Sequence, residues 1–137
     1  MKIEEHEKAY KEHLNNLKRA IEESIEENQR NLGYNVSQGS VELFLIYLHK
    51  LNLLQGSGEQ LDHRIFKSKS LTEKKLPPEF LDKEKILELM GKIESKRNIF
   101  CYGKRKSSKE LQGYIKNFQE LRKVINKNLK LKNGREK

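Results

Sequence analysis

The ten residues "KRNIFCYGKR", from Lys96 to Arg105, bring together side chains that could hold a phosphate group. Arg97 carries a planar guanidinium that can donate two parallel hydrogen bonds to a phosphate, and Asn98 adds an amide beside it. Tyr102 supplies a hydroxyl five residues later. Further cations follow at Lys104, Arg105 and Lys106. We interpret Arg97 and Tyr102 as candidate catalytic residues and the others as binding residues; the alternative is a basic helix end that only improves solubility.

The position of Arg97 along its helix indicates that it needs an anionic partner. Apolar residues mark one face of this helix, and Arg97 interrupts them; they are Ile86, Leu89, Met90, Ile93 and Phe100. A guanidinium that faces a core must be paired, because an unpaired buried charge is costly. Glu42 and His49 lie seven residues apart on one face of another helix, and we expect Glu42 to pair with Arg97. Alternatively, Arg97 lies at the surface where the stripe rotates away.

Two amphipathic helices are predicted in the first part of the chain, from apolar residues spaced three, four or seven apart. The first covers residues 2–32 and ends at Gly33, a residue type that commonly follows a helix C-terminus. The second covers about residues 37–54, and Asn35 or Ser37 is expected to cap its first turn. This second helix is apolar on most sides, so we expect it to be the central element.

Two more helices are predicted in the second part of the chain. Asp82 is a suitable N-cap for the helix that carries Arg97. Ser107 followed by Glu110 has the spacing of a capping box, which predicts that a last helix starts there and runs to about residue 130.

The predicted fold is all-α: an antiparallel, up-and-down bundle of four helices. Residues 1–131 are expected to form this single domain, and residues 132–137 a basic C-terminal tail. A structureless connection as long as 55–81 is uncommon inside a compact domain. We therefore expect either mobility there or a short fifth helix around Leu61–Phe66.

Composition limits the class of protein further. Only 34% of the residues are hydrophobic and 36% are charged, so the core must be built from narrow apolar stripes. The single cysteine, Cys101, excludes an internal disulfide framework and favours a reducing compartment. The charged N-terminus is unlike a signal peptide, and the richest apolar run, "VELFLIYLHKLNLL", is too short and too charged to span a membrane. These features predict a cytoplasmic protein with no membrane partner.

The net charge of +9 lies entirely in the last quarter of the chain. Residues 104–137 contain twelve lysines and arginines and three glutamates, so residues 1–103 are neutral overall. A basic stripe confined to one element is a plausible surface for a polyanion. The alternative is a lysine-rich helix that faces solvent and only improves solubility, because it would have the same composition.

The segment "ESKRNIFCYGKR" resembles the signature of the HEPN superfamily (higher eukaryotes and prokaryotes nucleotide-binding domain). Its motif is an arginine, often followed by asparagine, then four to six variable residues and a histidine. The order of the helices is similar over most of the chain: a long first helix, an apolar second helix, an irregular connection, the motif helix and a last helix. Arg97 and Asn98 match the start of the motif.

This resemblance implies a symmetric homodimer in which two motif helices meet and their arginines line one cleft. In active members, the arginine and the histidine form a metal-independent ribonuclease. Other members bind RNA or nucleotides without catalysis, or act as partners of minimal nucleotidyltransferases in toxin–antitoxin pairs.

The chain departs from the motif at the histidine, because Tyr102 and the residues after it occupy every allowed position. A phenol ionises near pH ~10 and is a poorer base at neutral pH than an imidazole, which ionises near ~6.5. We therefore expect a homodimer that binds RNA or nucleotide phosphates at Arg97 and has lost its catalysis. The alternatives are a non-catalytic protein-interaction module paired with a nucleotidyltransferase, and a weak ribonuclease that uses Tyr102 or His49.

No metal site and no cofactor are predicted. The four histidines lie far apart in the sequence, and only His6 and His13 share a helix face, two turns apart. That spacing is too long for two ligands of one metal on one helix. The segment "QGSGEQ" lacks the spacing and the lysine of a phosphate-binding P-loop.

Overall fold

A computed structural model of the chain describes residues 2–54 and 61–136, with side chains described up to residue 131. Its regular structure is helical throughout these ranges, with no strand, which confirms the all-α prediction. The elements are α1 (Ile3–Glu23), α2 (Gln29–Lys50), a short 3-10 helix η1 (His63–Lys67), α3 (Lys69–Lys75), α4 (Lys83–Tyr102) and α5 (Ser108–Glu136).

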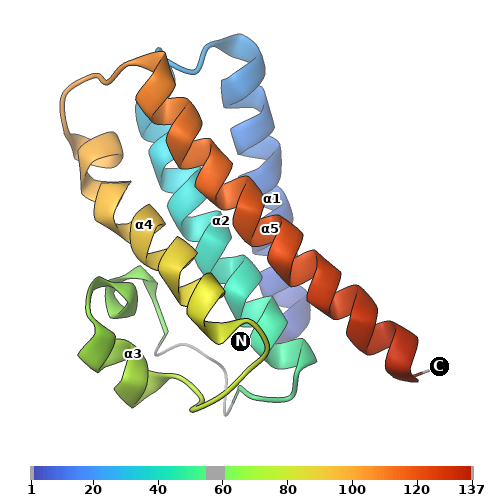
Figure 1. The fold of residues 1–137 in the computed structure, drawn as a ribbon. Coiled ribbons are helices and arrows are strands. Elements are labelled where there is room, and N and C mark those ends of the chain that lie inside the picture. The colour runs from blue at the N-terminus through green and yellow to red at the C-terminus, as the bar shows by residue number, and fades with distance from the viewer. Residues whose placement is uncertain (1, 55–60, 137) are drawn as a thin grey trace.

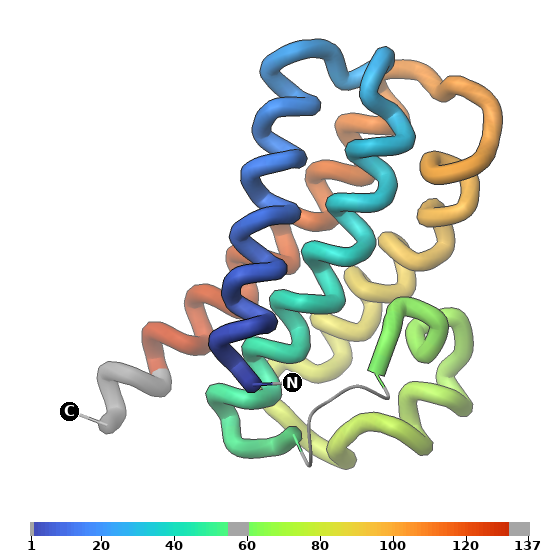
Figure 2. The backbone as a smooth tube through the Cα atoms, turned by 180° about the vertical axis from the view of Figure 1, so that it is seen from behind, coloured from blue at the N-terminus to red at the C-terminus, as the bar shows by residue number. Residues whose placement is uncertain are grey.

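The four long helices form the antiparallel bundle that the sequence predicts. The chain runs up α1, down α2, up α4 and down α5, and η1 and α3 lie beside the start of α4 (Figure 1). Helix α2 packs against α1, α4 and α5, which makes it the central element (Figure 2). Its most enclosed side chains are Leu32, Val36, Phe44, Tyr47 and Leu48. None of the described helices is both long and apolar enough to cross a membrane.

The boundary between the first two helices differs from the prediction. Helix α1 ends at Glu23 and α2 begins at Gln29, so Gly33 lies inside α2 and does not end a helix. The chain breaks at Ser24, which is extended and whose hydroxyl accepts a hydrogen bond from the Glu27 N–H at 3.2 Å. Local bonds of this kind give the backbone an alternative to the helix. The predicted caps at Asn35 and Ser37 are also wrong, because α2 begins at Gln29 and both residues lie inside it.

Gly33 is required inside α2 because α4 comes very close to it. A Cβ atom added there would lie 2.9 Å from the Cβ of Phe100 and 3.2 Å from the backbone nitrogen of Cys101. The Tyr114 hydroxyl of α5 donates a hydrogen bond to the Gly33 carbonyl at 2.9 Å. Gly33 therefore marks the point where α2, α4 and α5 meet.

The starts of α4 and α5 are capped differently. Ser107 acts as predicted: its hydroxyl accepts from the Glu110 N–H at 3.2 Å. Asp82 occupies the N-cap position of α4 but makes no side-chain cap. Its φ of 58° is left-handed, and its carboxylate accepts instead from the Asn128 side chain at 3.0 Å. Asp82 thus joins α4 to α5 at the end of the bundle opposite to Arg97.

The connection contains more helix than predicted. The short helix expected around Leu61–Phe66 appears as η1, and α3 follows it. Phe66 of η1 is buried, with its ring centroid 5.5 Å from that of Phe44. Residues 55–60, which belong to the predicted mobile segment, lie outside the described residues. At the other end of the chain, α5 continues to Glu136, through most of the predicted tail.

Gly33→Ala is expected to destabilise the protein by about 1–2 kcal/mol, because the new methyl group forces α2 and α4 apart. Gly113→Ala is the matched control. Gly113 lies within α5 on its exposed face, and a Cβ atom added there would have no neighbouring atom within 4 Å. Alanine there should stabilise the protein by about 0.5–1 kcal/mol through helix propensity. Denaturant titration measures both values, and equal effects of the two substitutions would contradict the close helix contact.

Candidate anion-binding site at Arg97

The Arg97 side chain lies on the inward face of α4 and is 8% exposed. Its Nε atom is enclosed and has no hydrogen-bond acceptor. Gly33 contacts Phe100 and Cys101 of α4, and α2 and α4 are antiparallel. Because the helices are antiparallel, one turn forward along α2 from Gly33 and one turn back along α4 from Cys101 place Ser37 and Arg97 at the same level of the bundle.

No carboxylate neutralises Arg97 within the described parts of the chain, where the ion pairs all involve other residues. The prediction that Glu42 pairs with Arg97 is wrong. Oε2 of Glu42 lies 2.6 Å from Nδ1 of His6 on α1. Glu42 is nine residues after Gly33, which is half a turn around α2, so it faces α1 while Gly33 faces α4.

His49 shares the α1-facing side of α2 with Glu42, as the spacing predicts. Its ring centroid lies 5.5 Å from that of His6, and the Nε2 atoms of both rings are enclosed without a hydrogen-bond partner. Burial lowers the pKa of His49 below its ordinary value, and the nearby His6 lowers it further. This group of polar residues belongs to the α1–α2 contact and lies on the other side of α2 from Arg97.

A carboxylate–imidazole pair next to Arg97 was not predicted from the sequence. Glu94 lies one helical turn before Arg97 and is 7% exposed. Both of its carboxylate oxygens are 3.0 Å from Nδ1 of His63 in η1. Since Nδ1 is occupied by the carboxylate, the Nε2 atom of His63 is the one left to exchange a proton. Glu94 and His63 thus form a part-buried ion pair where η1 meets α4, one helical turn from Arg97.

The field of Arg97 acts on two buried groups around it. Burial raises the pKa of the Cys101 thiol, and the positive charges of Arg97 and Arg30 oppose that rise. Burial also raises the pKa of the Tyr114 hydroxyl well above its ordinary value. Both groups are therefore neutral near pH 7 and do not supply the negative charge that Arg97 lacks.

The end of α4 is held by Arg30 in the first turns of α2. The two terminal nitrogens of Arg30 donate to the carbonyls of Cys101 and Gly103, at 2.6 and 3.1 Å. A helix C-terminus leaves carbonyl groups without donors, and its dipole attracts cations. The Arg30 guanidinium supplies both the hydrogen-bond donors and the positive charge. It fixes the segment that follows Arg97 against α2.

The predicted binding residues after α4 take part in the same contact. Gln29 donates to the Lys104 carbonyl at 3.0 Å and accepts from the Lys106 N–H at 2.6 Å. The Arg105 side chain donates to the carbonyls of Glu26 and Glu27, each at 3.1 Å. Arg105 therefore holds the turn between α1 and α2, whereas the Lys104 side chain is exposed.

Arg97 and Tyr102 are not brought together. Five residues correspond to about 140° around a helix, and Tyr102 points outward with 71% of its surface exposed. Asn98 is also exposed, on the outer side of α4. The phenol therefore cannot act on a phosphate held at Arg97 of the same chain.

The fold and the site define an all-α helical bundle with a buried arginine that has no carboxylate partner among the described residues, and with a carboxylate–imidazole pair one helical turn away. The chain matches no model of a known protein family, and neither characterised proteins nor solved structures show a match to it. Within the described ranges, no three histidine, cysteine or acidic residues lie close enough together to hold a metal ion.

The lowered pKa of His49 predicts that the protein loses stability in mild acid. The unfolded chain binds a proton at this residue near pH ~6.5, whereas the folded chain binds it only at lower pH. The free energy of unfolding should thus be constant above this range and fall as the pH decreases through it. Denaturant titrations between about pH 8 and 5 should show a shallower fall for His49→Gln than for the wild type. Parallel curves for the two proteins would contradict this assignment.

Proposed function

We propose that this chain is a HEPN-like homodimer that binds RNA or nucleotide phosphates at Arg97. The observation that carries the proposal is the enclosed guanidinium of Arg97, which is 8% exposed and has no carboxylate partner among the described residues. The two acidic residues that could have neutralised it are engaged elsewhere: Glu42 binds His6, and Glu94 binds His63.

A phosphate ligand would remove the energetic problem at Arg97. A buried charge without a partner costs several kcal/mol, and a phosphate offers oxygens at the spacing of the guanidinium nitrogens. Binding would therefore depend on Arg97, whose side chain is held in place by packing. The lysines of the chain would add long-range attraction for the phosphate.

The outer face of α4 supports the homodimer part of the proposal. Ile99 and Tyr102 are exposed there, and Asn98 lies next to them. Aromatic residues exposed together with aliphatic ones are typical of protein interfaces. In the proposed dimer, this face of α4 contacts the same face of a second copy. Arg97 lies on the inward face of α4, so the two arginines would not line one shared cleft as the HEPN resemblance implies, and each chain would carry its own site.

Arg97→Met should lower the affinity for a fluorescent RNA oligonucleotide by about tenfold or more, because a charged hydrogen bond to phosphate is lost. The unfolding free energy should stay unchanged or rise, since removing an unpaired buried charge is not destabilising. Arg19→Met, at an exposed arginine of α1, is the matched control and should bind normally. Light scattering of the same samples should give twice the mass of the chain.

Two results would contradict this proposal. The first is an unchanged affinity of Arg97→Met for RNA at low salt. The second is a large loss of stability in Arg97→Met, which would show that Arg97 serves the fold and not a ligand.

Metal-independent cleavage of RNA is a second candidate function, and the Glu94–His63 pair favours it. A carboxylate that holds Nδ1 of an imidazole orients the ring and supports the positive charge that forms when Nε2 takes a proton. His63 could accept the proton of a ribose 2′-hydroxyl while that oxygen attacks the adjacent phosphorus. The bond to the 5′-oxygen breaks, and this oxygen takes a proton from water and leaves as a 5′-hydroxyl. The other product is a 2′,3′-cyclic phosphate, and in this proposal Arg97 stabilises the charge on the phosphate.

This function predicts cleavage of single-stranded RNA in the presence of a chelator, with cyclic phosphate ends. His63→Gln should abolish the cleavage, and Glu94→Gln should reduce it by about tenfold or more because the imidazole is no longer oriented. Tyr102→Phe should cleave normally, since Tyr102 faces away from Arg97. RNA that stays intact with the wild-type protein would exclude this function and leave the binding proposal standing.

A further inference from the structure

A line of lysines runs along the solvent side of α5. They are spaced seven, seven, four and three residues apart and so share one face of the helix: Lys109, Lys116, Lys123, Lys127 and Lys130. The opposite face of α5 is buried in the core through Leu111, Phe118, Leu121 and Ile125. At a rise of 1.5 Å per residue, the line extends over about 32 Å. We name these five residues the α5 lysine stripe.

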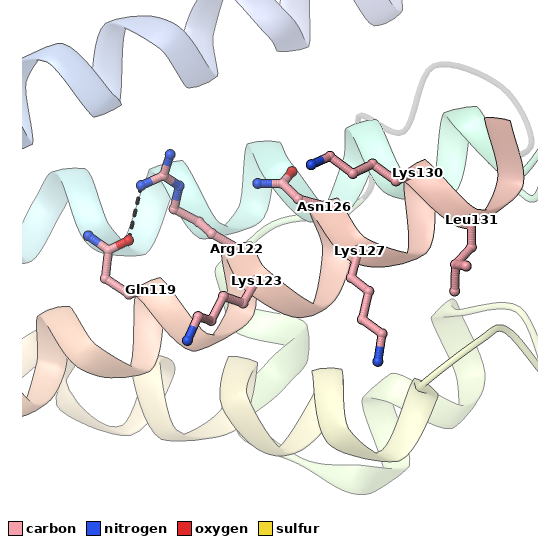
Figure 3. A pocket seen from close by; sticks show the side chains of 7 residues that line it. All are labelled: Gln119, Arg122, Lys123, Asn126, Lys127, Lys130 and Leu131. Atoms are coloured by element: carbon pink, nitrogen blue, oxygen red, sulfur yellow. Dashed lines mark hydrogen bonds between the residues drawn. The ribbon is translucent and has the colours of Figure 1, made fainter. Parts of the chain in front are cut away.

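The second half of the stripe borders a shallow hollow of about 600 Å³ that contains no acidic side chain. Figure 3 shows Lys123 and Lys127 extending from one side of α5, with Arg122 and Lys130 on the other. Arg122 is held in place, because it donates to the Gln119 side chain and to the Tyr10 hydroxyl, each at 3.0 Å. The ion pairs of the described side chains involve none of the lysines of the stripe.

The first half of the stripe continues into a groove between α4 and α5. This groove has a volume of about 510 Å³, and four lysines line it: Lys85, Lys92, Lys96 and Lys116. Glu110 and Glu120 also line it, so cations outnumber acidic residues there by two to one. The hollow on α5 and the α4–α5 groove are thus both lined by more basic than acidic residues.

We infer that the α5 lysine stripe binds the phosphate backbone of a nucleic-acid duplex, without reading its sequence. Along the axis of a B-form duplex the phosphates of one strand recur every ~3.4 Å, so the stripe covers the axial length of about nine of them. Lysine side chains act as flexible point charges that suit backbone contacts, and they carry no base-specific geometry. This surface is separate from Arg97, which lies on the inward face of α4.

Two other classes of partner fit the stripe less well. Single-stranded nucleic acid is usually held by bases stacking on aromatic side chains. The stripe and its hollow contain none, and Phe100 and Tyr114, which line the α4–α5 groove, are buried. A membrane surface requires an apolar face next to the cations, but the apolar face of α5 is buried in the bundle, and Leu131 alone is exposed beside the hollow. A straight row of cations with amides between them favours a duplex.

The test compares two triple variants that lose the same charge. Lys123→Gln/Lys127→Gln/Lys130→Gln removes three of the five lysines of the stripe, and Lys8→Gln/Lys11→Gln/Arg19→Gln removes three cations that line a hollow on α1. Fluorescence anisotropy measures binding of each protein to RNA and DNA duplexes of about 20 base pairs, which exceed the length of the stripe. A single strand of equal length and anionic phospholipid vesicles are the competing probes, and salt is varied for each.

The stripe variant should bind both duplexes about tenfold or more weakly at 100 mM salt, and its slope of log K against log salt should be smaller by about 2–3. The α1 variant should bind like the wild type. The inference is overturned if the two variants lose equal affinity, if the stripe variant binds duplexes normally, or if Arg97→Met protein, which lacks the proposed Arg97 site, prefers the single strand or the vesicles. Arg97→Met should keep its duplex affinity, so failure of the Arg97 proposal and failure of this one give different results.

Discussion

The close contact between α2 and α4 at Gly33 is the constraint on which the rest of the structure depends. With no side chain at this position, the two helices approach until Phe100 and Cys101 touch the α2 backbone. That approach brings Arg30 within reach of the last carbonyls of α4 and exposes the Gly33 carbonyl to the Tyr114 hydroxyl. A wider spacing would break both contacts, and it would open the pocket in which Arg97 is enclosed.

The central position of α2 explains why its polar residues serve different neighbours. A helix that packs on three sides has no single polar face, so each buried polar group must find a partner in the helix it happens to face. Glu42 meets His6 of α1, whereas the buried hydroxyl of Ser37, near the level of Arg97, has no hydrogen-bond partner and carries no charge. The guanidinium is left without an anion because the acidic residue of α2 points the other way.

Local features of the chain could be predicted, and features that join distant residues could not. The helical periodicity and the Ser107 cap depend on residues within a few positions of each other, so they were predicted correctly. The sequence predicts a helix end at Gly33, because a glycine that ends a helix cannot be distinguished in the sequence from a glycine at a close contact between two helices. The Glu94–His63 pair joins residues 31 positions apart, and one of them lies in a connection with no periodic pattern.

Arg97 and the α5 lysine stripe are physically different cations, although both contribute to the same net charge. The guanidinium is enclosed in a low-dielectric environment where salt screens it little, and its orientation is set by packing. The lysines lie in water on flexible side chains, so their attraction for phosphate weakens steeply as salt rises. A ligand that contacts both would be attracted over a distance by the stripe and oriented only where it reaches Arg97. Salt would then act mainly on the affinity that the stripe supplies, and little on the affinity that Arg97 supplies.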